Sequence, residues 1–137
     1  MSETVKSRRP AQPVAGTYRV GFLLVPGFPM MAFAAAVEPL RAANRLSGCA
    51  LYEWCLFSRD GRPVRASNGI DVAVHGDVAS PAVVDLLLVC AGTHETRGHA
   101  ASVRWLRAAG RAGVAVGGIS LGAYLVAEAG LLDGRRC

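Results

Sequence analysis

The stretch Val114–Gly134, VAVGGISLGAYLVAEAGLLDG, decides the fold of this chain. It opens with the short apolar run Val114–Val116, which predicts a strand buried on both faces of a parallel sheet. Gly117 and Gly118 follow, then Ser120, and apolar residues recur after them at helical spacing. A strand, a sharp turn and a helix in this order predict a nucleophile elbow, which lifts the side chain of Ser120 above the carboxyl edge of the sheet.

The same pattern also fits an ordinary turn, in which the hydroxyl of Ser120 bonds to a free N–H of the first helical turn. A strand–Gly–Ser–Gly–helix pattern alone does not separate the two interpretations. Chemistry at Ser120 requires a base beside the hydroxyl. His94 and His99 are the candidate bases, and Glu95 could orient one of them. The alternative is that these three side chains lie on a solvated loop.

Apolar runs and helical stripes alternate along the rest of the chain. Pro39 falls inside the first helical stripe and is expected to kink or split that helix. Asp60-Gly61 is a hairpin signal, and Ser67–Gly69 marks another turn. This alternation predicts a three-layer α/β/α domain with a mostly parallel sheet. The predicted strands are 18–25, 51–58, 64–66, 70–74, 86–90 and 114–116, and the predicted helices are 30–46, 100–111 and the segment after the elbow.

Ligands of such sheets bind outside the carboxyl ends of the strands, where the loops 26–30, 91–98 and 118–122 should meet. Backbone N–H groups near Gly92 and after Ser120 would hold a carboxylate there, and an amine could lie against an aromatic ring. The alternative is that these residues are ordinary loop and core packing. The candidate ligand-binding residues are Gly27, Phe28, Met30, Gly92, Thr93, His94, Glu95, Ser120 and Leu121.

Composition limits the function classes. The chain has 137 residues, 52% of them hydrophobic, which suits one domain with a sizeable core. We expect no membrane span, because no apolar run approaches the ~20 residues that one needs. The four cysteines form no Cys-x-x-Cys pair, and the N-terminus is no signal peptide, so a reduced, cytoplasmic protein is expected. Neither metal-ligand spacing nor a nucleotide-binding glycine motif is present, so we expect no metal and no cofactor.

The net charge of +5 lies at the two ends of the chain. Residues 20–134 hold nine Arg against nine Asp and Glu, so the body has no positive excess to attract phosphates. Residues 1–16 combine basic residues with prolines and show no periodicity. They are expected to form a disordered basic tail.

Two segments resemble the N-terminal domain of GlxA-type transcriptional regulators: LLVPGFPMMAFAAAVEPLRAANRLSG at 23–48 and GGISLGAYLVAEAGLLDGRR at 117–136. RDGRPVRASNG and LLLVCAG fit the same family in order. These regulators join a class I glutamine-amidotransferase-like, PfpI-like domain to a C-terminal AraC-type helix-turn-helix domain. The resemblance implies a flavodoxin-like sensor domain over 17–137 that is incomplete at its C-terminus, because the relatives continue with a strand carrying a histidine.

The resemblance also implies partners. A homodimer is expected, with DNA contacted only through the C-terminal domain, which is missing from these residues. The form of the first helix is most similar to the subgroup that senses arginine, glycine betaine or carnitine. The expected ligand is therefore a small amino-acid or quaternary-amine metabolite.

This sequence departs from the active members of the family at two positions. Their elbow residue is Cys, which here is Ser120, followed by Leu121. Their acidic residue after the first strand is matched by Ala32, whereas Gly92 matches the glycine of the oxyanion hole. The resemblance therefore implies a sensor without catalytic activity. The alternative is a PfpI-like amidase or protease, or a glyoxalase-like enzyme, that uses Ser120.

Overall fold

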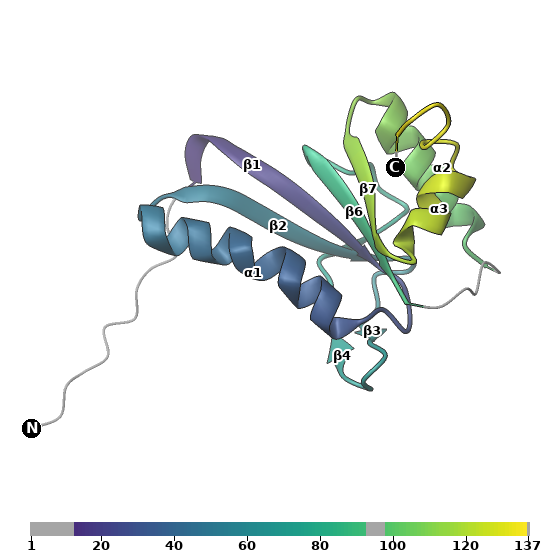
Figure 1. Cartoon of the computed structure of the whole chain (residues 1–137), viewed down its shortest axis with the longest axis horizontal. Coiled ribbons are helices and arrows are strands. Elements are labelled where there is room, and N and C mark those ends of the chain that lie inside the picture. The colour runs from purple at the N-terminus through teal and green to yellow at the C-terminus, as the bar shows by residue number, and fades with distance from the viewer. Residues whose placement is uncertain (1–12, 93–97, 137) are drawn as a thin grey trace, which may run out of the picture.

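The computed structural model describes residues 13–92 and 98–136. Five strands form one parallel sheet in the order β5-β2-β1-β6-β7 (Figure 1). Because every pairing in this sheet is parallel, the carboxyl ends of all the strands share one edge. The strands are β1 (Pro13–Leu24), β2 (Ala50–Ser58), β5 (Gly76–Asp77), β6 (Leu86–Ala91) and β7 (Ala115–Ser120).

Helices cover both faces of the sheet, which confirms the predicted three-layer architecture. Helix α1 (Met30–Ser47) packs on one face through Phe33, while α2 (Ala100–Arg111) and α3 (Gly122–Glu128) pack on the other (Figure 1). Pro39 lies inside α1, which nevertheless continues as one helix. No helix in the described part of the chain is long and apolar enough to cross a membrane.

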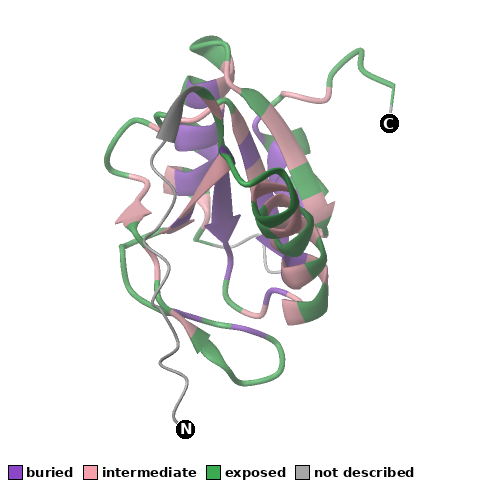
Figure 2. Ribbon diagram, turned by 90° about the vertical axis from the view of Figure 1, so that its left-hand side faces the viewer, coloured by how far each residue is buried: buried purple, intermediate pink, exposed green. Residues whose placement is uncertain are grey.

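The core is built around β1, the middle strand. Phe22, Leu23 and Leu24 are at most 1% exposed, because neighbouring strands and both helical layers enclose them. Figure 2 shows the buried residues gathered in the middle of the sheet, with exposed residues on the outer turns of the helices and on the loops. An apolar run buried on both faces explains why the sequence 20–25 lacks the alternation of a half-buried strand.

Three expectations about the strands were wrong. The first strand begins at Pro13, so residues 13–16 belong to the sheet and not to the basic tail predicted for 1–16. The strand before the elbow is not buried on both faces, because β7 lies at the sheet edge and Ala115 is exposed. The Asp60-Gly61 turn joins no antiparallel pair, since β2 pairs in parallel with both of its neighbours.

A separate hairpin lies beyond the carboxyl edge. Its strands are β3 (Val64–Arg65) and β4 (Asp71–Val72), and they pair antiparallel around the turn predicted at Ser67–Gly69. The two-residue β5 was not predicted, because so short a strand has no periodicity to detect.

Candidate functional site

The elbow after β7 is strained. Ser120 has a φ of 54°, and it is the only non-glycine residue with positive φ in the described part of the chain. The left-handed region costs an L-residue about 1–2 kcal/mol, so the surrounding structure must hold this turn in place. Helix α3 begins after Leu121 and has no side-chain cap hydrogen bond. The elbow interpretation therefore fits better than an ordinary turn capped by Ser120.

Two glycines make so sharp a turn possible. A Cβ on Gly118 would overlap the backbone nitrogen of Ala123, and a Cβ on Gly122 would overlap the carbonyl oxygen of Val89. The segment 118–122 thus meets the steric demands of a Gly-x-Ser-x-Gly elbow, in which helix and strand approach closely on both sides of the serine.

The loops predicted to meet at the carboxyl edge do meet there. Ser120 lies beside Ala91 in the register of β6 and β7, and the Leu121 N–H donates to the Ala91 carbonyl at 3.0 Å. A Cβ on Gly92 would lie 2.5 Å from the carbonyl oxygen of Gly27. Gly27, Gly92 and Ser120 therefore share one edge of the sheet. Thr93, His94 and Glu95 lie outside the described residues.

The β3–β4 hairpin supports the loop after β1. The Gly27 N–H donates to the Arg65 carbonyl at 2.8 Å, and the Ser67 N–H donates to the Phe28 carbonyl at 2.9 Å. Two 2.9 Å bonds from the Arg65 guanidinium to the carboxylate of Asp71 close the hairpin and hold the pKa of Asp71 below its ordinary value. This support was not predicted from the sequence, although the opposite charges of Arg65 and Asp71 flank the predicted turn.

Phe28 was wrongly expected to present its ring to a ligand. Its side chain is 0% exposed, and its ring packs edge-on against that of Phe33, with the centroids 5.7 Å apart. Phe28 is a core residue that anchors the start of α1. Met30 is half-buried and packs against the same core cluster, whereas the neighbouring Met31 is 84% exposed.

Neither of the two histidines that the structure describes is hydrogen-bonded to Ser120. His99 immediately precedes α2, and His75 accepts a hydrogen bond on Nδ1 from the Leu56 N–H at 2.9 Å. Ala32 lies half-buried in the first turns of α1, where the resemblance places the acidic residue of active relatives. Burial raises the pKa of the Cys90 thiol to about 12, so that sulfur is also no nucleophile.

A cavity of about 460 Å³ opens at the carboxyl ends of β1 and β2, and Ser120 does not line it. The strand ends, the turn before β3 and the first residues of α2 enclose it. This cavity was not predicted from the sequence, because the residues that line it are distant along the chain. The lining residues are Leu23, Leu24, Val25, Pro26, Ser58, Arg59, Asp60, Arg62, Pro63, Val64, Arg65, His99 and Ser102.

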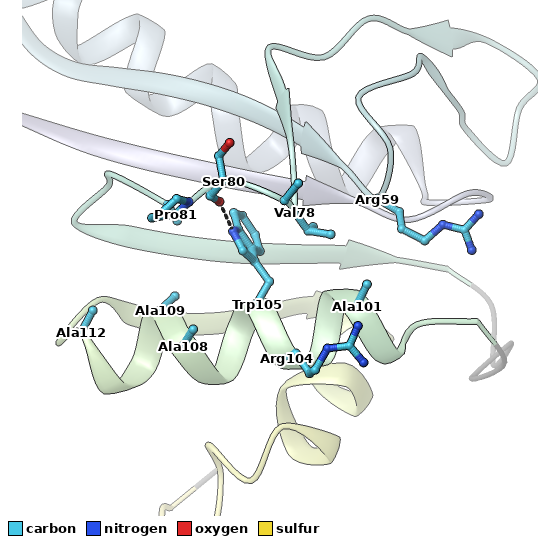
Figure 3. A pocket seen from close by; sticks show the side chains of 12 residues that line it. Arg59, Val78, Ser80, Pro81, Ala101, Arg104, Trp105, Ala108, Ala109 and Ala112 are labelled. Carbon is cyan, nitrogen blue, oxygen red and sulfur yellow. Dashed lines mark hydrogen bonds between the residues drawn. The ribbon is translucent and has the colours of Figure 1, made fainter.

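A second cavity, of about 540 Å³, lies between α2 and the segment 78–82 (Figure 3). Trp105 forms its floor, and the indole Nε1–H donates to the Ser80 carbonyl at 2.6 Å. Figure 3 shows the guanidinium groups of Arg59 and Arg104 at one end of this groove, pointing away from the indole. In the described residues, no group of three or more His, Cys, Asp or Glu side chains could hold a metal ion.

Comparison with known proteins places the chain beside bacterial regulators, although no family model matches it. The HTH-type transcriptional regulator CdhR of Pseudomonas aeruginosa is 52% identical over 84% of this chain and 34% of its own length. The HTH-type transcriptional regulator GlxA of Rhizobium meliloti is 42% identical over 85% of this chain and 37% of its own. The chain thus spans about a third of the length of these relatives.

A relative of similar length also exists. An uncharacterized protein of Streptomyces lividans is 34% identical over 89% of this chain and 86% of its own length. A crystal structure of an AraC family transcriptional regulator from Pseudomonas putida superposes with a TM-score of 0.79 at 31% identity, over 88% of this chain and 65% of that one.

Proteins that are not named as regulators share the same fold. A DJ-1 superfamily protein from Agrobacterium tumefaciens has a TM-score of 0.68 over 86% of this chain and 61% of its own, and its 23% identity shows the fold alone. The parallel sheet, the elbow at 118–122 and the sequences of the relatives all indicate the same family. The chain belongs to the family of these GlxA-type transcriptional regulators, matches about a third of their length, and has the fold of the DJ-1 superfamily proteins.

Proposed function

We propose that this chain is the ligand-sensing and dimerisation domain of a cytoplasmic transcriptional regulator. In this proposal it binds a small amino-acid or quaternary-amine metabolite without transforming it. The regulator would contact DNA through a different domain. The observation that carries the proposal is an elbow kept in its strained geometry around Ser120, with Ala32 at the matching acidic position.

The geometry suggests how such a metabolite is held. Ser120 is exposed, and its hydroxyl can donate to a carboxylate without a base beside it. Gly92 and Gly27 pack against each other at the same edge, because a Cβ on Gly92 would lie 2.5 Å from the Gly27 carbonyl oxygen, so this backbone contact fixes the wall beside Ser120. Because Phe28 is buried, the amine end of the ligand cannot rest on its ring, and we assign the neighbouring side chain of Met30 to that end instead.

Calorimetry on the chain tests this proposal, with arginine, glycine betaine and carnitine as ligands. We expect saturable binding of at least one, weakened about tenfold or more in Ser120→Asn, where the larger side chain still tolerates positive φ. Ser47→Asn, at the far end of α1, is the matched control and should bind like wild type. Equal affinities in both variants would place the ligand elsewhere and overturn the proposal.

A turnover assay separates the sensor from the alternative enzyme. The substrates are small amides and methylglyoxal, because amidase and glyoxalase-like chemistry are the two alternatives that Ser120 could serve. We expect rates at the level of buffer alone. A rate above this background that disappears in Ser120→Ala would establish the enzyme and refute the sensor without chemistry.

A further inference from the structure

We infer that the cavity of about 460 Å³ at the carboxyl ends of β1 and β2 is a second ligand site, which binds a small monocarboxylate through Arg59 and Arg62. Its lining includes neither Ser120 nor Gly92, so it is distinct from the elbow. The inference does not depend on the proposed function, because it rests on the charge and shape of this cavity alone.

The cavity carries an uncompensated positive charge. Its lining holds three arginines and one acidic residue, Asp60. Arg65 is already paired with Asp71. Asp60 accepts the backbone N–H of Arg62 at 3.2 Å, a bond that shapes the turn. Subtracting the two carboxylates from the three guanidinium groups leaves one net positive charge, which matches a ligand with a single negative charge.

Two guanidinium groups remain available to that ligand. The Arg62 guanidinium forms no hydrogen bond or ion pair with the residues that the structure describes. Arg59 donates to the Gly98 carbonyl at 3.3 Å, a long bond that occupies one of its five N–H donors. Guanidinium groups bind carboxylates and phosphates in a planar, often bidentate geometry, and the single net positive charge of this cavity matches a monocarboxylate better than a doubly charged phosphate.

A hydrogen bond from the buried side chain of Ser58 holds the turn that carries Arg62. The Ser58 side chain is buried, and its hydroxyl donates to the Arg62 carbonyl at 2.9 Å. The loss of conformational freedom on binding is therefore confined to the arginine side chains, which favours affinity.

The rest of the wall is apolar. Leu24 and Val25 form its base, and the exposed rings of Pro26 and Pro63 form its rim. A ligand that fits this wall carries a short aliphatic body beside its carboxylate. The cavity volume, which lies toward the small end of the roughly 300–1,000 Å³ range of ligand pockets, is large enough to admit such a molecule.

Butyrate is the probe, titrated into the labelled chain at neutral pH and moderate salt while NMR follows the backbone and arginine Nε–H resonances. We expect saturable shifts at residues 59–65 and 99–102. Affinity should fall about tenfold in Arg62→Gln and in Arg59→Gln, because each removes a charged hydrogen bond. Arg111→Gln is the matched control, since Arg111 is an exposed arginine in the last turn of the same helix that borders the cavity.

The outcomes separate the alternatives. Equal affinity in Arg62→Gln, Arg59→Gln and the control would overturn the inference, as would butyrate shifts centred on 92 and 120. Equal shifts with inorganic phosphate and with butyrate would show simple charge attraction and also overturn it. Butyrate binding in a chain that binds no zwitterion would leave this site standing and refute the proposed function.

Discussion

At the scale of single residues, the elbow depends on glycines more than on its serine. Gly118 and Gly122 face backbone atoms that cannot move aside, whereas a Cβ on Gly117 would meet only the Leu88 side chain, at 3.1 Å. The neighbouring glycines 117 and 118 are therefore not equivalent, although they are identical in the sequence. Position 117 could accept a small side chain because the Leu88 side chain is flexible. Position 118 requires glycine because α3 approaches β7 closely there.

Gly118→Ala should lower the free energy of unfolding by at least about 2 kcal/mol, because the added methyl group forces α3 away from the strand. Gly117→Ala is its control and should change stability by less than about 1 kcal/mol, since Leu88 can change rotamer. Urea denaturation followed by circular dichroism measures both. Similar losses in the two variants would contradict the close packing at the elbow.

The cysteines differ as sharply as the glycines. Cys90 is 0% exposed, and burial raises its pKa to about 12, so almost no thiolate exists near pH 8. Cys49 is exposed. Mass spectrometry after brief iodoacetamide treatment of the folded chain at pH 8 should find Cys49 alkylated and Cys90 unmodified. Cys90 should react only after unfolding in urea, and its rapid modification in the native chain would contradict the buried position.

At the scale of elements, the β3–β4 hairpin connects the Arg65–Asp71 ion pair to the loop after β1. The Arg65 guanidinium lowers the pKa of Asp71, so the ion pair is fully formed above the ordinary aspartate range and is lost as pH falls through the lowered pKa. Because Arg65 also accepts the Gly27 N–H through its carbonyl, loosening of the hairpin should reach the loop at 26–28.

Amide hydrogen exchange tests this link. At a pH low enough to protonate Asp71, the Gly27 and Ser67 amides should be less protected from exchange than at neutral pH. The rates are first corrected for the intrinsic pH dependence of exchange. Asp71→Asn should show the reduced protection already at neutral pH. Glu128→Gln, on α3 far from the hairpin, serves as the control. Protection that is independent of pH in the wild-type chain would show that the ion pair does not hold the hairpin.

The elements also show what sequence reasoning can reach. Helix α2 lies at 100–111, as predicted, because its apolar stripe is local and strongly periodic. The parallel sheet and the meeting of Gly27, Gly92 and Ser120 followed from general rules on strand ends. The burial of Phe28 could not be predicted, since an aromatic residue after a strand fits either a core or a ligand wall. The cavity beside Arg62 depends on contacts between segments distant in the chain.

At the scale of the whole molecule, the net positive charge lies at the two ends of the chain and not in its central part. Residues 20–134 hold nine Arg against nine Asp and Glu, so this range as a whole has no net positive charge to attract a phosphate backbone. Any affinity of this chain for DNA should come from the basic residues near its N-terminus and fall steeply with salt.

Electrophoretic mobility shifts with an arbitrary duplex should therefore show weak binding at low salt and none at ~0.15 M. Deletion of residues 1–12, which leaves β1 complete, should abolish the remaining shift. Deletion of the C-terminal Arg135–Cys137 is a control for the other basic end. A mobility shift of one particular duplex at ~0.15 M salt by the chain without residues 1–12 would contradict this prediction, because it would show that the folded part binds DNA itself.

The position of β7 has a further consequence. It pairs with β6 and, within the described residues, with no other strand, so the N–H and C=O groups along its outer side have no strand partner there. An open strand edge is a template for β-augmentation, in which another strand docks by main-chain hydrogen bonds. Two successive glycines, Gly117 and Gly118, weaken the β-propensity of this edge and so limit indiscriminate pairing. Any strand that does add there would end beside Ser120 and supply a new wall to the elbow.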